Sequence, residues 1–221
     1  MRIVAISDVH NRYHNLLIPK CDVLISAGDY SFHGEPHVVK AYHEWLHQQP
    51  ADHIISGQGN HEVWVEKNFD EAKAIALAAC PRVDFLEEGR VVIDGVNFWY
   101  ASVTPWFCNW AYNRWRGPEI AAHWRKIPED TNVLIAHGPP YGILDIVPYV
   151  NGVPKKRVGC HDLLARIKEL PNLDINIFGH IHHSHGEHHE DGVSYYNVAV
   201  CDEQYVPSNG ITVIDYIKDD E

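Results

Sequence analysis

Two histidines, His180 and His182, lie two positions apart, directly after a short apolar run at residues 175–178 and one glycine. Side chains at positions i and i+2 of an extended chain point to the same side, so two imidazoles delivered at the end of a strand can bind metal. Two imidazoles alone are not enough to hold an ion, and four other segments carry further polar candidates. These candidates are Asp8, His10, Asp29, Asn60, His61 and His137.

The candidate set combines carboxylates, imidazoles and one amide, which suits borderline divalent ions such as Mn, Fe, Zn, Ni or Co better than Ca or thiolate-seeking metals. Even without His61 the set offers seven ligands, which are too many for one such ion but suit two ions with a bridging carboxylate. Two ions about 3.5–4 Å apart clamp the attacking and leaving oxygens of a phosphoryl displacement. The residue types therefore predict a dinuclear metal centre for phosphate-ester hydrolysis.

Each candidate follows an apolar run with the composition of a β-strand, at residues 3–7, 21–26, 53–55, 132–136 and 175–178. Further strands are predicted at 83–86, 90–93, 96–103, 193–200 and 211–217, and helices at 35–49, 68–79, 119–126 and 161–170. Ligands of α/β sheets bind beyond the carboxyl ends of the strands. Residues far apart in the sequence can therefore converge on one cleft.

Composition narrows the classes of partner. The 221 residues include 30 acidic and 18 basic side chains, a net charge of −12. Such a surface argues against extended nucleic acid and membranes as partners, whereas bound cations would still attract a phosphate. Five scattered cysteines without a CxxC motif are typical of reduced core thiols in a cytoplasmic protein. We find no signal sequence, transmembrane run or domain boundary, and expect one domain over residues 1–221.

The motifs Asp-x-His, Gly-Asp, Gly-Asn-His-Glu, His-Gly-Pro and Gly-His-x-His occur here in that order. Together they resemble the calcineurin-like metallophosphoesterase superfamily, from residue 3 to about residue 216. Residues 27–30, 137–140, 157–160 and 178–182 are most similar to its class III cyclic-nucleotide phosphodiesterase-like branch, and especially to the brain-type metallophosphoesterase-domain-containing proteins. The resemblance implies an α/β fold in which two mixed β-sheets pack face to face with helices on their outer faces.

The resemblance also implies roles for single residues. The first metal ion would bind Asp8, His10, Asp29 and His182, and the second would bind Asp29, Asn60, His137 and His180. A hydroxide shared by both ions would attack the phosphorus, and His61 would protonate the leaving alkoxide. Manganese is the favoured metal. Some animal members lack the first histidine of the last motif, but this chain keeps His180, which implies a competent site.

The predicted function is hydrolysis of phosphodiesters, with small or cyclic nucleotides as substrates. The Gly28-Asp29-Tyr30 run looks like that of the protein Ser/Thr phosphatases, but Phe32 and His33 stand where those enzymes have Asp and Arg. Protein monoesters are therefore a poor fit. The alternatives are a phosphomonoesterase of broad specificity with the same metals, and a scaffold that keeps the fold without the chemistry.

Four further features leave their roles open. The aromatic loop at residues 104–115 is either a wall that stacks on a nucleobase or a hydrophobic patch buried in a homodimer. The basic residues 155–157 either meet the charge of the substrate or are simply solvated. Glu62 either orients its neighbours His61 and Asn60 or, as we favour, places a charge at a helix N-terminus. The histidines at positions 183, 185, 188 and 189 are predicted to lie in a solvated loop with incidental metal affinity.

Overall fold

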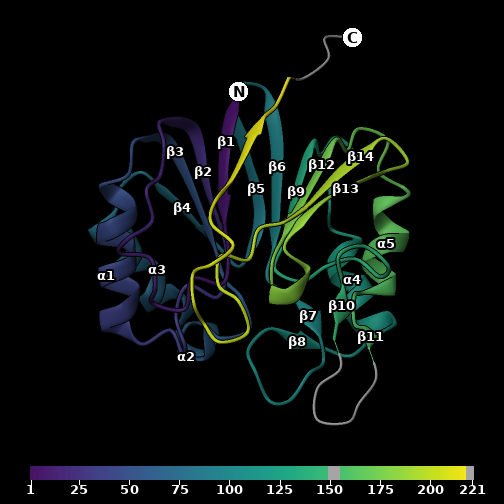
Figure 1. Cartoon of the computed structure of the whole chain (residues 1–221), viewed down its shortest axis with the longest axis horizontal. Helices are drawn as coiled ribbons and strands as arrows, with labels where there is room; N and C mark the ends of the chain where they lie inside the picture. The colour runs from purple at the N-terminus through teal and green to yellow at the C-terminus, as the bar shows by residue number, and fades with distance from the viewer. Residues whose placement is uncertain (149–154, 218–221) are drawn as a thin grey trace.

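The computed structural model of this chain describes residues 1–148 and 155–217. Two β-sheets lie face to face, and helices cover the outer face of each sheet (Figure 1). The first sheet has the strand order β15-β1-β2-β3-β4, and the second has the order β13-β14-β12-β9-β6-β5. Both sheets contain parallel and antiparallel pairs. The predicted α/β fold with two mixed sheets is confirmed.

Alternating apolar side chains build the first sheet. Its strands are β1 (Arg2–Ile6), β2 (Cys21–Ala27), β3 (Ala51–Gly57), β4 (Val83–Leu86) and β15 (Thr212–Asp215). Val4 and Leu24 pack in the cluster shared with the helices, whereas Ile3 and Val23 pack against the second sheet, because successive side chains of a strand face opposite sides. The helices on this side are α1 (Pro36–His47), α2 (Val63–Lys67) and α3 (Phe69–Ala79).

The second sheet follows the same rule. Its strands are β5 (Glu88–Ile93), β6 (Val96–Ala101), β9 (Val133–Ala136), β12 (Ile175–Phe178), β13 (Gly186–Glu190) and β14 (Val193–Asn197). Val133 and Ile135 point to the first sheet, and Leu134 points to the outer helices α4 (Pro118–Trp124) and α5 (His161–Ile167). One apolar layer thus lies between the two sheets, and each sheet packs a further apolar layer against its outer helices.

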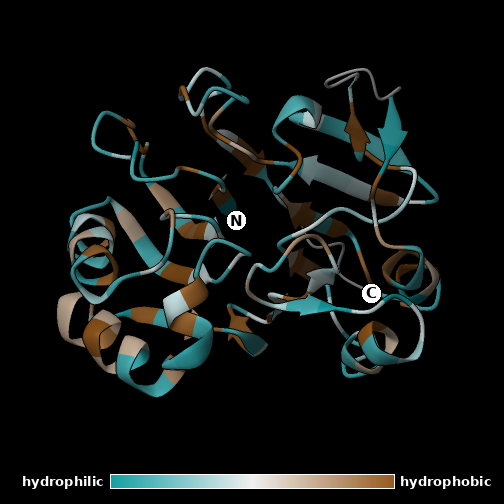
Figure 2. Cartoon of the chain, turned by 90° about the horizontal axis from the view of Figure 1, so that it is seen from below, coloured by the Kyte–Doolittle hydropathy of each residue, from teal (hydrophilic) through white to brown (hydrophobic). Residues whose placement is uncertain are grey.

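The helices show mixed hydrophobic and hydrophilic colours in Figure 2, as expected for elements with one buried face. In α1 the buried residues Val39, Tyr42 and Leu46 recur at helical spacing, and Pro36 lies at its first turn, where the missing N–H costs nothing. No helix within residues 1–148 and 155–217 has the length and apolar character needed to cross a bilayer.

Several short elements lie outside the predicted strands and helices. The aromatic loop contains β7 (Thr104–Pro105), which pairs with β8 (Asn113–Arg114). Between the predicted strand at 132–136 and the predicted helix at 161–170, β10 (Ile146–Val147) pairs antiparallel with β11 (Lys156–Arg157). Residues 149–154 lie outside the described part of the chain. Two-residue strands and the five-residue α2 are too short to produce a periodic apolar pattern.

The prediction of a loop for the histidine-rich segment is wrong. The segment forms a 3₁₀ turn, η1 (His182–Ser184), and then the edge strand β13, which pairs antiparallel with β14. Asp191 and Gly192 connect the two strands with positive φ values of 52° and 81°, as a tight hairpin turn requires. His183, His188 and His189 are solvent-exposed, as predicted, whereas His185 is half-buried. An exposed edge strand lacks the apolar alternation by which strands are recognised.

The parallel strands of the two sheets deliver their carboxyl ends to the same end of the molecule. β1 begins beside the N-terminus at the top of Figure 1, and β2 and β3 run parallel to it. In the second sheet β9 and β12 run parallel to each other. A bridge between Ser7 and Ala199 and a hydrogen bond from Ser7 N to the Val198 carbonyl (3.0 Å) join the sheets there.

Candidate metal centre

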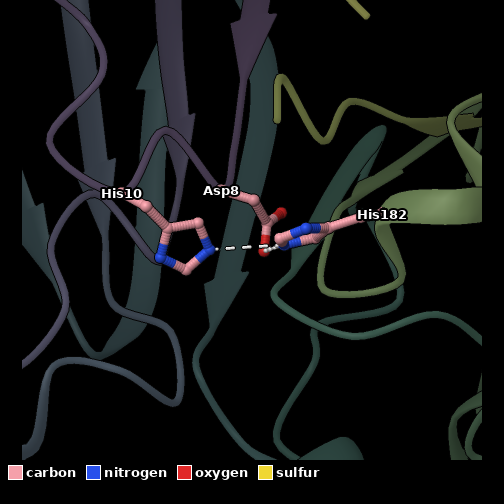
Figure 3. A group of neighbouring side chains, drawn as sticks. All are labelled: Asp8, His10 and His182. Atoms are coloured by element: carbon pink, nitrogen blue, oxygen red, sulfur yellow. Dashed lines mark hydrogen bonds and ion pairs between the residues drawn. The ribbon is translucent and has the colours of Figure 1, made fainter. Parts of the chain in front are cut away.

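All of the side chains predicted for the site meet at this joint between the sheets. Three overlapping groups have their ligand atoms within 4.8 Å of one another: Asp8, His10 and His182; His10, Asp29 and His61; Asp29, His137 and His180. Oδ1 of Asn60 lies 3.0 Å from Nε2 of His137 and completes the set. Figure 3 shows the first group, with its three side chains pointing toward one another. Each sheet contributes part of the cluster.

The chain turns sharply where it presents these groups. The backbone φ values are 54° at Asp8, 39° at His10, 51° at Asp29 and 67° at His180, a left-handed region that non-glycine residues seldom occupy. Gly59 is needed for space, because a Cβ atom there would lie 2.3 Å from Oδ1 of Asp29. Strained backbone of this kind concentrates at functional sites.

Backbone carbonyls orient the histidines. Nδ1 of His10, His61, His137 and His182 lies 2.9–3.2 Å from the carbonyl oxygens of Ser31, Phe32, Ala27 and Asp202, respectively. A carbonyl only accepts hydrogen bonds, so each Nδ1 must carry a proton and donate it. In the neutral ring Nε2 is then the unprotonated, ligand-ready nitrogen.

These Nε2 atoms converge on other acceptors. Nε2 of His182 lies 3.3 Å from Nε2 of His10 and 3.3 Å from Oδ1 of Asp8. That Oδ1 atom is buried and has no hydrogen-bond partner among the described residues. Nε2 of His137 lies 3.3 Å from Oδ2 of Asp29 and also faces Asn60. Lone pairs this close repel unless a cation lies between them, so the donor set fits divalent metal ions.

In the metal-free protein, protons bound to histidine rings supply part of the positive charge that a metal ion would otherwise place between these lone pairs. Burial lowers the pKa of His137, but the Asp29 and Asp8 carboxylates outweigh it and raise the pKa to about 10. At His182, burial again lowers the pKa, but the hydrogen bond and the charge of Asp8 outweigh it and raise the pKa to about 9. Burial dominates at His180 and lowers its pKa to about 4. Since metal ligands must be deprotonated, metal binding at neutral pH would release protons from His137 and His182.

Glu62 organises the turns beneath the cluster. It is the N-cap residue of α2, but its carboxylate is fully buried. It accepts hydrogen bonds from the backbone N–H groups of Gly59 (2.8 Å), Asp29 (2.9 Å) and Ser31 (3.1 Å), and from Ser31 Oγ (2.9 Å). Burial, with help from Asp29, raises its pKa to about 8. The favoured prediction of a simple helix charge is wrong, because the side chain joins the turns that present Asp29 and Asn60.

Replacing Glu62 by alanine should lower the free energy of unfolding by at least about 3 kcal/mol. Three buried N–H groups would lose their acceptor, and each such loss costs about 1–3 kcal/mol. Urea denaturation of the metal-free protein measures the change. The matched control is Glu71→Ala, whose side chain is exposed on α3 and which should shift the free energy by less than about 0.5 kcal/mol. A similar small shift for both variants would contradict the structural role of Glu62.

A cleft of about 470 Å³ opens above the cluster. The aromatic loop contributes Trp106, Phe107 and Trp110 to its lining, and the ring centroid of Trp110 lies 4.3 Å from that of His61. The cleft thus has an aromatic wall next to the predicted proton donor. Whether a dimer also covers this loop stays a prediction.

Two of the basic residues 155–157, Lys156 and Arg157, have different surroundings. Lys156 lines the cleft, whereas Arg157 forms an ion pair with the buried Asp145 (2.8 Å). Arg116, which carried no motif in the sequence, also lines the cleft, and its guanidinium donates to the carbonyls of Val158 (2.6 Å) and Gly159 (2.8 Å). Positive charge therefore reaches the cleft from two segments.

The cysteines stay outside the cluster. Cys21, Cys80, Cys160 and Cys201 are buried, as expected of core thiols, but Cys108 is exposed. The prediction of a core position for Cys108 is wrong, because the residue lies on the solvent-facing part of the aromatic loop, next to Phe107, which is also exposed.

Comparison with known proteins assigns the chain to a class. Residues 1–184 match the family described as calcineurin-like phosphoesterase. The chain therefore belongs to the calcineurin-like phosphoesterase family, whose members use divalent metal ions. It is 33% identical to the human protein named metallophosphoesterase domain-containing protein 1, over 97% of this chain and 70% of that protein. The resemblance inferred from the motifs is confirmed.

Solved structures agree on the fold. A phosphopantetheinyl hydrolase from Mycobacterium tuberculosis superposes with a TM-score of 0.65 at 16% identity, over 96% of this chain and 95% of that one. A structure described as a novel archaeal phosphodiesterase gives a TM-score of 0.52 at 16% identity, over 97% and 93% of the two chains. At such low identity these matches show the fold alone.

Proposed function

We propose that this protein hydrolyses phosphodiesters, with small or cyclic nucleotides as its substrate class, with two divalent metal ions. The observation that carries the proposal is the convergence of Nε2 and carboxylate lone pairs from both sheets at the floor of one cleft. Family membership supports the reaction class. The mixed ligand set favours Mn²⁺, with Fe, Zn, Ni and Co as alternatives.

Seven side chains would hold the ions in two groups that share Asp29. These are Asp8, His10, Asp29 and His182, and Asp29, Asn60, His137 and His180. When bound, the ions would supply an activated water and neutralise charge on the phosphate. The protein itself fixes the ligand geometry through the Nδ1–carbonyl bonds and through the amide N–H of His180, which donates to Oδ2 of Asp8 (2.8 Å).

The contacts of His61 support its proposed role as the general acid. Its backbone N–H donates to Oδ1 of Asp29 (2.8 Å), and its Nε2 lies 3.9 Å from Oδ2 of the same carboxylate. Because the Phe32 carbonyl holds the proton of Nδ1, a second proton on Nε2 makes an imidazolium. Donating that proton to the leaving oxygen returns the ring to its neutral form.

The surroundings favour a diester with a planar organic group. Phe32 stacks on His10 with a centroid distance of 5.3 Å and places an apolar ring at the position where protein phosphatases have a carboxylate. Trp106 and Trp110 offer flat surfaces on which a base can stack. Lys156 and Arg116 add positive charge to the cleft.

An activity panel on metal-reconstituted protein tests the proposal. The substrates are bis-p-nitrophenyl phosphate, p-nitrophenyl phosphate, and 2′,3′- and 3′,5′-cyclic nucleotides. We expect kcat/KM to be higher for the diesters than for the monoester, because Phe32 and His33 stand where protein phosphatases have Asp and Arg. A monoester preference with several metals would favour the phosphomonoesterase alternative. Metal-loaded protein without any turnover would favour a scaffold.

A further inference from the structure

Tyr205 is a bulky residue in a backbone conformation that side chains rarely adopt. Its φ is 57°, in the left-handed region that glycine occupies most readily. Its N–H donates to the carbonyl of Asp202 (3.0 Å), so Tyr205 ends a four-residue turn. Glycine is the residue preferred at this position of a common turn. Tyrosine is therefore unfavourable for the backbone at this position. Its side chain is expected to make contacts outside the turn that offset this cost.

The loop at residues 202–209, called the Asp202 loop below, holds the residue there. The carboxylate of Asp202 accepts hydrogen bonds from the backbone of Gln204 (2.9 Å) and Val206 (3.0 Å) and from Ser208 Oγ (3.0 Å). The side chain of Asn209 donates to the carbonyls of Ala199 (3.1 Å) and Cys201 (3.3 Å). These hydrogen bonds fix the conformation of the Asp202 loop.

The Asp202 loop faces the candidate metal centre. Its Asp202 carbonyl is the acceptor for Nδ1 of His182 (2.9 Å). The ring of Tyr205 stands edge-on to His10 with a centroid distance of 4.7 Å, and packs near Phe32 (5.3 Å) and His182 (5.8 Å). The side chain is nonetheless 38% exposed and lines the cleft. One side of the ring is therefore packed, and the rest is open to a ligand.

We propose that Tyr205 is a specificity-determining residue that contacts the planar organic group of the substrate, and that the strained backbone of the Asp202 loop is what aims it there. The proposal rests on the proposed function. The phosphate would lie at the ligand cluster, and the attached ring would pack between Tyr205 and the aromatic wall. A substrate with an aromatic group, such as a nucleotide, would then bind better than one without it.

Equilibrium binding tests the contact without requiring turnover. Adenosine 5′-monophosphate and inorganic phosphate are titrated calorimetrically into the metal-loaded wild type, Tyr205→Gly and Tyr205→Phe. In Tyr205→Gly we expect the Kd of adenosine monophosphate to rise about tenfold, since base–aromatic stacking has about that effect, while the Kd of phosphate stays unchanged. Tyr205→Phe should keep near wild-type affinity, because the ring makes the contact.

Stability separates this role from a structural one. Glycine relieves the backbone strain while the ring contacts are lost, so Tyr205→Gly should stay folded and keep its metal content. Val206→Ala, in the same loop with an exposed side chain, is the control and should change neither binding nor Tm. An unchanged Kd for adenosine monophosphate in Tyr205→Gly, or equal binding of adenosine monophosphate and phosphate by the wild type, would overturn the proposal.

Two further outcomes keep the proposals distinct. Loss of metal together with a lower Tm in Tyr205→Gly would mean that the ring merely supports His10 and His182, and would also overturn the specificity role. If the wild type binds adenosine monophosphate through Tyr205 but hydrolyses no diester in the activity panel, the proposed function fails while the role of Tyr205 in binding stands.

Discussion

Asp29→Ala should lower the metal content of the purified protein from about two divalent transition ions per chain to almost none, and turnover should disappear with the metal. Asp29 belongs to two of the three ligand groups. Its Oδ2 atom lies 3.3 Å from Nε2 of His137, and its Oδ1 atom accepts a hydrogen bond from the backbone N–H of His61. In the proposed centre, removing this carboxylate would take the shared ligand from both ions. Elemental analysis after dialysis measures the stoichiometry.

The control for this variant is Asp52→Ala, because Asp52 is an exposed aspartate on β3. It should retain both ions and full activity. Circular dichroism of each variant establishes whether the fold is intact before the metal contents are compared. A wild type that holds only one ion at saturating metal would contradict the dinuclear centre. So would an Asp29→Ala protein that retains one ion tightly.

His61→Ala should keep its metal and its fold but lose about 10²-fold or more in kcat on substrates with poor leaving groups. The predicted role of His61 is to protonate the leaving alkoxide, a step that an alkyl or ribose oxygen needs. p-Nitrophenolate leaves without a proton, so the loss should shrink for p-nitrophenyl esters. The measurement is kcat across a series of diesters whose leaving groups differ in basicity, alongside metal analysis.

His33→Ala is the matched comparison for this variant. His33 also lies beside Trp110, with a centroid distance of 6.3 Å, but it belongs to none of the ligand groups among the described residues. Its replacement should not change the dependence on leaving group. Metal loss in His61→Ala would make His61 a ligand, as its place in the group with His10 and Asp29 allows. An equal rate loss for good and poor leaving groups would mean that His61 positions the phosphate instead.

The sequence predicted the strands and the cluster well because both depend on local patterns. Short apolar runs followed directly by Asp, Asn or His indicated strand ends, and parallel strands bring such ends together. Asp8 and His180, 172 residues apart, are joined by a hydrogen bond in this way. The order of the five motifs also indicated the protein family, which the spacing of the candidate ligands alone does not identify.

The remaining features depend on contacts that leave no local signal. The direction of the Glu62 side chain is decided by the N–H groups of Asp29 and Ser31, more than 30 residues away. The orientation of the Tyr205 side chain depends on the hydrogen bond to Asp202 and on the ring contact with His10, which is 195 residues away in the sequence. A polar edge strand such as β13 lacks apolar alternation altogether. Such features become visible only when the tertiary structure is known.

The pairing of β1 with β15 has a consequence for the order in which the protein matures during synthesis. Strand β1 carries Asp8 and His10 at its end, yet its neighbour β15 and the Asp202 carbonyl belong to the last tenth of the chain. Contacts between such distant segments form late, because the loop between them must close first. The parallel strands β1, β2 and β3 can assemble on a growing chain, but the ligand cluster cannot close until residues 202–215 have been synthesised. Metal binding is therefore expected only after residues 202–215 have folded back onto β1, and truncation after residue 201 should cost the protein its metal before it costs the protein its helices.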